Sequence, residues 1–309
     1  MIRTTQRRTL TLEAPDAPGR APHVSAASGL VAVGAWLYVI ADDSLHLAVF
    51  PRQGEAPGRT VRLFPGELPQ EPKARKAAKP DLEALCALPP FPACPHGALL
   101  AVPSGSTAGR NQGALLPLTP EGTLAGAVHP LDFTGLYTHL ARHVGPLNVE
   151  GAAVAGGRLR LLQRGNGEAG VDALLDLDHE RVVHALEAGR APGGDVLRAV
   201  RRWELGRSGP VRLSFTDAAP LPDGRMVFTA AAEDSRDAYA DGAVTGSAVG
   251  LLAPDGTPLF LDAVDAKVKL EGVSAHVEAG RIHLLLVADA DAPEVASPLL
   301  EAVLEAVPG

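Results

Sequence analysis

Residues 150–163 read Glu-Gly-Ala-Ala-Val-Ala-Gly-Gly-Arg-Leu-Arg-Leu-Leu-Gln, and this stretch decides the fold. A Gly-Gly turn joins two apolar runs, and the second run alternates apolar and basic residues as a β-strand does. After a polar exit, a third run follows at residues 173–177, Ala-Leu-Leu-Asp-Leu. The stretch therefore predicts three antiparallel strands that begin at a carboxylate.

The same pattern recurs along the chain, each time opened by a similar short box. The boxes with a carboxylate are Asp81-Leu82-Glu83-Ala84-Leu85, Asn148-Val149-Glu150-Gly151-Ala152, Phe215-Thr216-Asp217-Ala218-Ala219 and Lys269-Leu270-Glu271-Gly272-Val273. A weaker copy, residues 28–34, has Ser28 where the others have an acid. The aligned positions are 55, 67, 67 and 54 residues apart. Repeats of this size indicate one supersecondary module used several times.

Three or four antiparallel strands, repeated five times, predict an all-β fold, a five-bladed β-propeller that spans residues 1–309 as a single domain. Residues 8–12, Arg-Thr-Leu-Thr-Leu, are expected to supply the outer strand of the last blade, which closes the ring and removes free edges. The alternatives are a six-bladed ring and a β-sandwich, since residues 51–80 are too rich in proline and charge to place. Residues 132–144 and 194–203 are predicted to form short helical insertions over one face.

Composition restricts the function. Hydrophobic residues make up 46% of the chain and aromatic residues 4%, with 33 Gly and 27 Pro, which suits short strands and turns. The net charge of -8 and the absence of a basic stripe argue against nucleic acid as a partner. No run of about 20 apolar residues predicts a membrane span. Residues 1–13 do not resemble a secretory signal, so a cytoplasmic location is expected, although a mature exported protein would look the same. The oligomeric state does not follow from the sequence.

Two cysteines and two histidines carry little chemistry by their spacing. Cys86 and Cys94 lack enough neighbouring ligands for zinc, and we interpret them as ordinary thiols or at most a disulfide. His139 and His143 are interpreted as surface residues of a helix, because Leu140 stands where a zinc protease needs Glu.

The repeated acids predict a metal site. In a propeller the first strand of each blade lines the central channel, so equivalent side chains form a ring. The ring predicted here consists of Ser28, Glu83, Glu150, Asp217 and Glu271. Crowded carboxylates raise one another's pKa, and a cation removes that penalty. All-oxygen ligands favour Ca²⁺, or Mg²⁺ with more bound water. The alternative is that the acids accept hydrogen bonds from amides of the neighbouring blade.

A second ring is predicted where the second strands end, at the channel mouth. It comprises Asp42, Ser44, Ser104, Ser106, Arg164, Asn166, Glu233 and Asp289, with Lys79, Asp81, Asn148 and Lys269 flanking the inner acids. Arg164 beside a metal would suit a small anionic ligand such as a phosphate or carboxylate. This favours a metal-dependent hydrolase of a small phosphoester, ester or lactone, with Arg164, Glu233 and Asp289 as candidate catalytic residues. The missing nucleophile favours the alternative, a non-enzymatic ligand-binding or scaffold propeller with a structural calcium.

The Asp-Leu-Glu-Ala, Asn-Val-Glu-Gly and Lys-Leu-Glu-Gly boxes resemble those of propeller proteins related to the esterase-like phytase domain and, more distantly, the gluconolactonase/paraoxonase group. The order Ser, Glu, Glu, Asp, Glu also resembles the five-bladed calcium-activated nucleotidases (apyrases), with Lys269–Gly272 matching the Lys-x-Glu-Gly box of their last blade. This resemblance implies one axial calcium held at the ring positions above. It covers about five residues per blade, and we expect the nearest relatives to be uncharacterised bacterial proteins.

Overall fold

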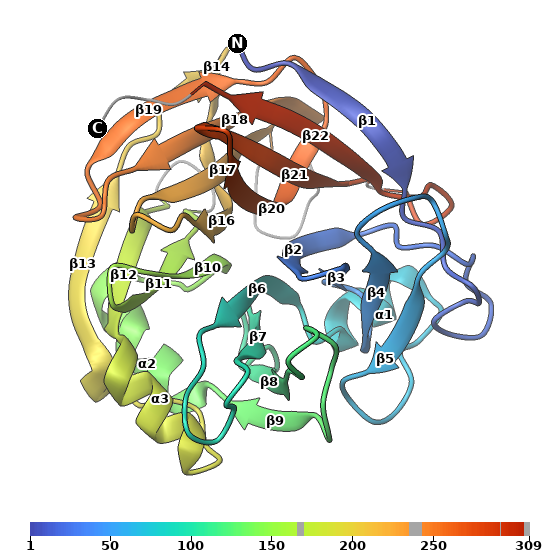
Figure 1. Cartoon of the computed structure of the whole chain (residues 1–309), viewed down its shortest axis with the longest axis horizontal. Coiled ribbons are helices and arrows are strands. Elements are labelled where there is room, and N and C mark those ends of the chain that lie inside the picture. The colour runs from blue at the N-terminus through green and yellow to red at the C-terminus, as the bar shows by residue number, and fades with distance from the viewer. Residues whose placement is uncertain (166–169, 235–242, 291, 306–309) are drawn as a thin grey trace.

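The computed structural model describes residues 1–309 except 166–169, 235–242, 291 and 306–309. In the described residues, five four-stranded antiparallel sheets surround a central axis (Figure 1). The predicted all-β, five-bladed propeller with short helical insertions is therefore confirmed, and the six-bladed and sandwich alternatives are not.

The blades are numbered along the chain, and their strands are given from the axis outward. Blade 1 has β2 (Ala27–Val33), β3 (Trp36–Ala41), β4 (His46–Pro51) and β5 (Arg59–Arg62); blade 2 has β6 (Leu82–Leu88), β7 (Ala98–Pro103), β8 (Gln112–Pro117) and β9 (His129–Asp132); blade 3 has β10 (Val149–Ala155), β11 (Arg158–Gln163), β12 (Asp172–Asp178) and β13 (Leu197–Trp203); blade 4 has β16 (Ser214–Pro220), β17 (Met226–Asp234), β18 (Ala243–Leu252) and β19 (Pro258–Ala263); blade 5 has β20 (Lys269–Glu278), β21 (Arg281–Asp289), β22 (Pro298–Leu304) and β1 (Thr4–Thr9). Consecutive inner strands contact one another around the whole ring, so the ring of blades is closed around its axis (Figure 1).

The N-terminal strand completes blade 5, as the sequence predicts. β1 pairs antiparallel with β22, with Thr4 opposite Ala302. The strand lies at Thr4–Thr9, earlier than the predicted residues 8–12, because the chain turns toward blade 1 after Thr9. After this turn, the Leu12 amide donates a hydrogen bond to the Pro22 carbonyl at 2.7 Å.

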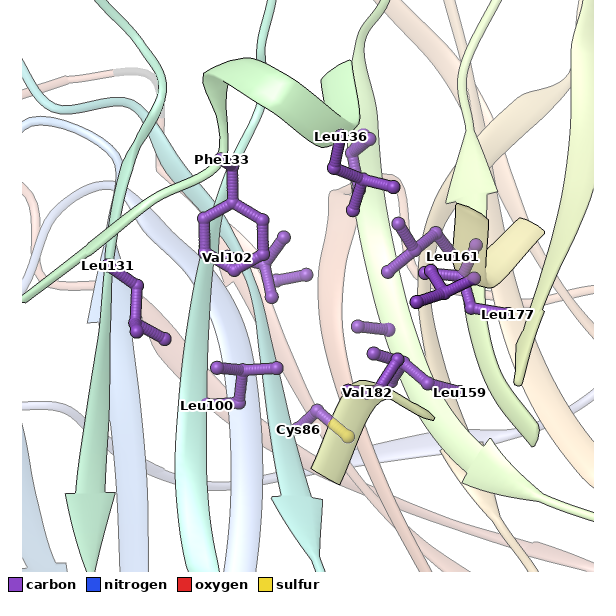
Figure 2. Close-up of a cluster of buried hydrophobic side chains, with 14 of the residues drawn as sticks. Cys86, Leu100, Val102, Leu131, Phe133, Leu136, Leu159, Leu161, Leu177 and Val182 are labelled. Carbon is purple, nitrogen blue, oxygen red and sulfur yellow. The ribbon is translucent and has the colours of Figure 1, made fainter. Parts of the chain in front are cut away.

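The hydrophobic core lies between neighbouring blades. Figure 2 shows the largest cluster, where side chains of blades 2 and 3 meet and Leu136 covers them from the helix above. Cys86 is buried in this cluster, and both cysteines are free thiols. Apolar residues on both faces of each sheet explain why the strands read as apolar runs in the sequence.

In the described part of the chain, three helices and two small elements fill the connections between strands. They are α1 (Pro72–Ala78), α2 (Thr134–Val144), α3 (His179–Glu187), a 3₁₀ turn (Gly194–Val196) and the hairpin of β14 (Arg207–Ser208) and β15 (Val211–Arg212). The helix predicted at residues 132–144 is present as α2, which buries one apolar stripe including Tyr137 and Leu140. Among the described helices, none is long and apolar enough to cross a membrane.

The helix predicted at residues 194–203 is wrong. Only Gly194–Val196 form a helical turn, and the rest is β13, which pairs with β12 from Leu197 to Trp203. Blade 3 needs an outer strand, and that pairing overrides the helical preference of an arginine-rich segment.

Candidate functional site

Each inner strand carries one extra, unpaired residue near its start. The pairing between the first and second strands skips a single residue in every blade, and the skipped residues are Ser28, Glu83, Glu150, Thr216 and Glu271. A β-bulge of this kind redirects a side chain and bends the strand. The repeated carboxylate seen in the sequence is thus a repeated bulge position.

Asp217 does not take the bulge position of blade 4, and this corrects the predicted ring. Thr216 is the skipped residue there, and its hydroxyl donates to Thr229 Oγ1 at 2.9 Å. Asp217 comes one residue later, which is the position of Gly151 in blade 3 and Gly272 in blade 5. The sequence alignment matched Asp217 with the acids of the other blades, whereas the strand pairing aligns Thr216 with them.

In blades 1, 3 and 5 a glycine follows the bulge, because neighbouring inner strands approach too closely there for a side chain. A Cβ on Gly151 would lie 2.9 Å from Cα of Asp217, and a Cβ on Gly272 would lie 2.9 Å from the Leu30 nitrogen. Both distances are shorter than carbon atoms tolerate in a packed interior. In the Glu-Gly pairs of the sequence boxes, the Glu is therefore the bulged residue, and the Gly allows the neighbouring blade to pack closely against the strand.

Asp217 is fully buried among the inner strands. Its Oδ2 accepts a hydrogen bond from the Val273 amide at 2.8 Å. Burial raises the pKa of Asp217 well above its usual range, and the backbone amides of Val273, Ala218 and Leu30 offset part of this effect. Asp217 thus ties blade 4 to blade 5, which matches the alternative reading of the acids as acceptors for neighbouring amides.

Lys79 lies between acids of blades 1 and 2. It is the C-terminal cap of α1, whose N-terminus is capped by the Glu71 side chain. The Lys79 ammonium contacts Asp42 and lies 2.8 Å from Asp81 Oδ1. Burial alone would lower the pKa of Lys79, but Asp42 and Asp81 more than offset it, so the net shift is upward. The proline-rich insertion before blade 2 thus delivers a permanent cation to the channel mouth.

Asp81 lies at the centre of the polar side chains around Lys79. It has a positive φ of 58°, an unusual conformation for a residue other than glycine. Its Oδ2 accepts from Arg110 at 2.9 Å and from Ser106 at 3.1 Å, and it also contacts the Ser104 hydroxyl. Burial would raise the pKa of Asp81, but Lys79 and Arg110 more than offset it and lower the pKa overall. Asp81 is therefore a fixed anion.

A second network joins blades 3, 4 and 5. Arg164 lies 3.4 Å from Glu150 Oε2 and 2.8 Å from Glu233 Oε2. Lys269 lies 3.3 Å from the same Glu233 oxygen and 2.8 Å from Glu271 Oε1. All five side chains are nearly buried, so the network carries charges from three blades in a region of low dielectric.

Acidic residues outnumber basic ones at the mouth in the part of the chain that the structure describes. The acids are Asp42, Asp81, Glu83, Glu150, Glu233, Glu271 and Asp289, and the bases are Lys79, Arg110, Arg164 and Lys269. Burial, together with Asp81 and Glu150, raises the pKa of Glu83 well above its usual range. Burial and Glu271 raise the pKa of Glu150 to about 7, although Arg164 opposes the shift. The mouth is thus short of positive charge.

Two carboxylate oxygens at the mouth are left without a partner. Among the described residues, Glu271 Oε2 and Asp42 Oδ1 are buried and accept no hydrogen bond. Asp42, Asp81 and Glu83 also bring carboxylate oxygens within 4.8 Å of one another. Buried, unpaired anionic oxygens are costly, and a bound cation is one of the few ways to satisfy them.

The remaining predicted residues are distributed around the same mouth, with two exceptions. Ser28 Oγ accepts from the Asp42 amide at 3.2 Å, and Asp289 pairs with Lys269 across β20 and β21. Ser44 instead bonds Asp16 at 2.6 Å, and Asn166 lies outside the described residues. Arg110 was missed because the sequence gives no sign that the loop after Ser106 brings its guanidinium back to Asp81.

Comparison with known proteins identifies the family of this chain. Residues 23–304, which include all the mouth residues, match the family of unknown function DUF6929. The chain belongs to DUF6929. No curated protein matches the DUF6929 chain. Its relation to the phytase-like and nucleotidase families stays a prediction.

Several solved structures are similar to this DUF6929 chain at low identity. One is a hypothetical protein from Leishmania major, with 12% identity, a TM-score of 0.48, and coverage of 97% of this chain and 90% of that one. Another is MPT-1, a GDP-Man-dependent mannosyltransferase from Leishmania mexicana, with 12% identity, a TM-score of 0.46, and coverage of 96% and 88%. An engineered GH43 glycoside hydrolase has 11% identity, a TM-score of 0.49, and coverage of 98% and 52%. Similarities at this level carry no argument about activity.

Proposed function

We propose that this DUF6929 chain is a cation-binding propeller that holds Ca²⁺ at the mouth of its central channel. The ligands would be the bulged residues Glu83, Glu150 and Glu271, with the hydroxyl of Ser28 as a neutral oxygen. The observation that carries the proposal is the excess of buried acids over bases at this mouth, including the unpartnered Oε2 of Glu271.

The donor chemistry supports calcium over other metals. All the proposed ligand atoms are oxygens, and they come from four different blades, which suits a cation that accepts irregular coordination. Mg²⁺ requires stricter octahedral geometry and keeps more water, so it is the second choice. Lys79 pairs with Asp42 and Asp81, and Lys269 pairs with Glu233 and Glu271. Among the proposed ligands, burial raises the pKa of Glu83 and Glu150, and a further cation would stabilise the charged forms of these two acids.

Thermal melting tests the proposal directly. The protein is melted in chelator, and Ca²⁺ or Mg²⁺ is then added back. A ligand at one hundred times its Kd stabilises the folded state by about 2.7 kcal/mol, which corresponds to a shift on the order of 5 °C for a protein of this size. We expect a shift of that order with Ca²⁺ and a smaller one with Mg²⁺.

Two variants test whether the calcium-induced shift depends on a carboxylate of the mouth or on a carboxylate of the surface. Glu150→Gln removes one proposed ligand and should abolish most of the calcium shift. Glu67→Gln removes an exposed carboxylate that belongs to neither charge network of the mouth and should leave the shift unchanged. If wild-type protein melts at the same temperature in chelator and in Ca²⁺, the calcium site does not exist.

A second candidate function is hydrolysis of a small phosphoester, ester or lactone at the same mouth. Arg164 and Lys269 favour it, because two cations beside a metal would hold an anionic substrate. Arg164 contacts Glu150 and Glu233 in this structure, so it would have to exchange a partner to bind substrate. Glu233 or Asp289 would act as the general base.

Chromogenic phosphoesters, esters and lactones, assayed with Ca²⁺ and with chelator, distinguish the two functions. Turnover that requires Ca²⁺ and is lost in Glu233→Gln would establish the hydrolase. A calcium-dependent melting shift without turnover on any substrate class would leave a cation-binding propeller without catalytic activity.

A further inference from the structure

A second group of metal-ligating side chains lies at the other end of blade 5. β20 begins at the mouth with Lys269 and ends at Glu278, where a tight turn through Ala279 and Gly280 leads into β21. Near this turn, His276 of β20 lies directly opposite His283 of β21, and their ring centroids are 5.2 Å apart. The group is thus built on a rigid hairpin.

Glu278 completes the group. It is two residues after His276 on the same strand, so both side chains point to the same face of the sheet. Its Oε2 lies 3.8 Å from His276 Nε2, and one ligand atom from each of the three residues lies within 4.8 Å of the others. Ligands around a tetrahedral zinc ion, at bond lengths of about 2.0–2.1 Å, are about 3.4 Å apart. Small rotamer changes are enough to close the remaining gap.

We propose that His276, Glu278 and His283 form a binding site for a divalent transition metal ion, with Zn²⁺ as the expected ion. Imidazole nitrogens distinguish this site from the all-oxygen mouth and select zinc-class metals over calcium. Two histidines and one carboxylate leave a coordination position for water. The side chains of His276 and Glu278 are 41% and 70% exposed, so the metal has a path from solvent.

Arg52 of blade 1 competes with a metal ion for the ring of His276. Its guanidinium lies 3.3 Å from His276 Nδ1, and because arginine can only donate, the neutral ring accepts that bond through Nδ1. The proton then sits on Nε2, facing Glu278. For His276 to bind a metal, either Nδ1 must release Arg52 or the ring must change tautomer, which also breaks the bond to Arg52. Removing the Arg52 side chain should therefore strengthen metal binding.

Other charges near the group are already paired. Arg281, opposite Glu278 in the hairpin, lies 3.4 Å from Glu305 Oε2. Burial lowers the pKa of His276, and Arg52 and His283 lower it further, while Glu278 opposes the shift; the net direction favours the neutral ring that a metal ligand requires.

Calorimetric titration with Zn²⁺ tests the site, in buffer that holds excess Ca²⁺ so that the carboxylates of the mouth do not contribute. We expect one zinc ion per chain with a Kd in the micromolar range. His276→Ala and His283→Ala should each weaken binding at least tenfold. Arg52→Gln should tighten it several-fold.

His143→Ala is the matched control. His139 and His143 on α2 have ring centroids 5.1 Å apart, almost the same separation as the blade 5 pair, but no acidic residue joins them in the described structure. This variant should bind zinc as the wild type does. The proposal is overturned if wild-type protein binds no zinc, or if the His276→Ala/His283→Ala double variant, folded by circular dichroism, binds it unchanged. Equal affinity in Arg52→Gln would overturn the competing role of Arg52.

Discussion

Gly151 illustrates how a single residue can be fixed by a neighbouring blade. It has an ordinary φ, so glycine is not required there by its own backbone conformation. The Asp217 backbone excludes a side chain at this position, because a Cβ on Gly151 would lie 2.9 Å from Cα of Asp217. The glycines after the bulges therefore set how closely the inner strands can approach one another.

Gly151→Ala should destabilise the protein by about 1–3 kcal/mol, because the added methyl forces two inner strands apart. Chemical denaturation measures this as a lower midpoint with an unchanged slope. Gly135→Ala is the control, since an added Cβ on this helical glycine meets nothing within 4 Å. That variant should be neutral or slightly more stable. Equal stability of Gly151→Ala and wild type would contradict the close contact.

Asp217 gives a prediction about pH. Because its folded pKa is raised, the folded state loses stability relative to the unfolded chain as pH rises from the unfolded pKa toward the folded one. Asp217→Asn keeps an acceptor for the Val273 amide without a charge. We expect the variant to match wild type near pH 4 and to exceed it in stability at pH 8, measured by urea midpoints. A variant that is less stable than wild type at pH 8 would show that the carboxylate is needed as an anion.

The sequence predicts the bulged acids of blades 2, 3 and 5 because each is followed by a small residue and an apolar run. It fails in blade 4, where Asp217 has the right chemistry but the wrong place in the backbone. A bulge shifts the register by one residue without leaving any mark in composition, so spacing alone could not separate Thr216 from Asp217.

At the scale of elements, β1 joins two blades as well as completing one. Arg8 extends from this strand to blade 1, where it donates to the carbonyls of Pro51, Gly54 and Ala56. Its guanidinium carbon also lies 5.3 Å from the centre of the Phe50 ring. The closing strand is thus held by a buried cation in addition to its ladder of hydrogen bonds.

Arg8→Ala should lower stability by about 2–4 kcal/mol, since it removes several charged hydrogen bonds and a cation–π contact. Arg7→Ala is the matched control on the same strand. Arg7 pairs with the half-exposed Glu301, and such surface pairs contribute less than about 1 kcal/mol. Thermal or denaturant melts of the two variants compare them directly. A loss in Arg7→Ala as large as that in Arg8→Ala would refute the special role of Arg8.

Element prediction from the sequence succeeded where hydrophobic periodicity was strong and failed where pairing decided the outcome. The inner strands and α2 have clear apolar periods. Residues 197–203 contain three arginines and have no clear period, and only the need of blade 3 for an outer strand makes them β13. The insertion at 51–80 could not be placed, although it forms β5 and the helix that positions Lys79.

On the scale of the whole molecule, all five blades contribute charged residues to the channel mouth, in one network of blades 1 and 2 and another of blades 3, 4 and 5. Asp42 belongs to blade 1, Asp81 to blade 2, Arg164 to blade 3, Glu233 to blade 4 and Lys269 to blade 5. Removing one partner of a buried pair leaves an uncompensated charge, which is more damaging than losing both. The stability of the ring should therefore depend on the charge balance of its mouth.

Lys269→Met tests this dependence. In chelator, loss of the ammonium should destabilise the protein by about 3–5 kcal/mol, because Glu233 and Glu271 remain buried without it. Ca²⁺ should restore more stability to this variant than it adds to wild type, as measured by melting temperature. The double variant Lys269→Met/Glu233→Gln, which removes both charges, should recover part of the loss even in chelator. A double variant no more stable than Lys269→Met would argue that the side chain acts by packing alone.

The closing strand also has a consequence for biosynthesis. β1 is translated before the other strands of the propeller and its partner β22 after them, and Thr4 must find Ala302. The entropy of closing such a long loop grows only with the logarithm of its length, so the finished ring loses little stability by this arrangement. Contacts so distant in sequence form slowly, however. During translation the blades therefore form an open arc, and β1 waits unpaired until β22 has been made.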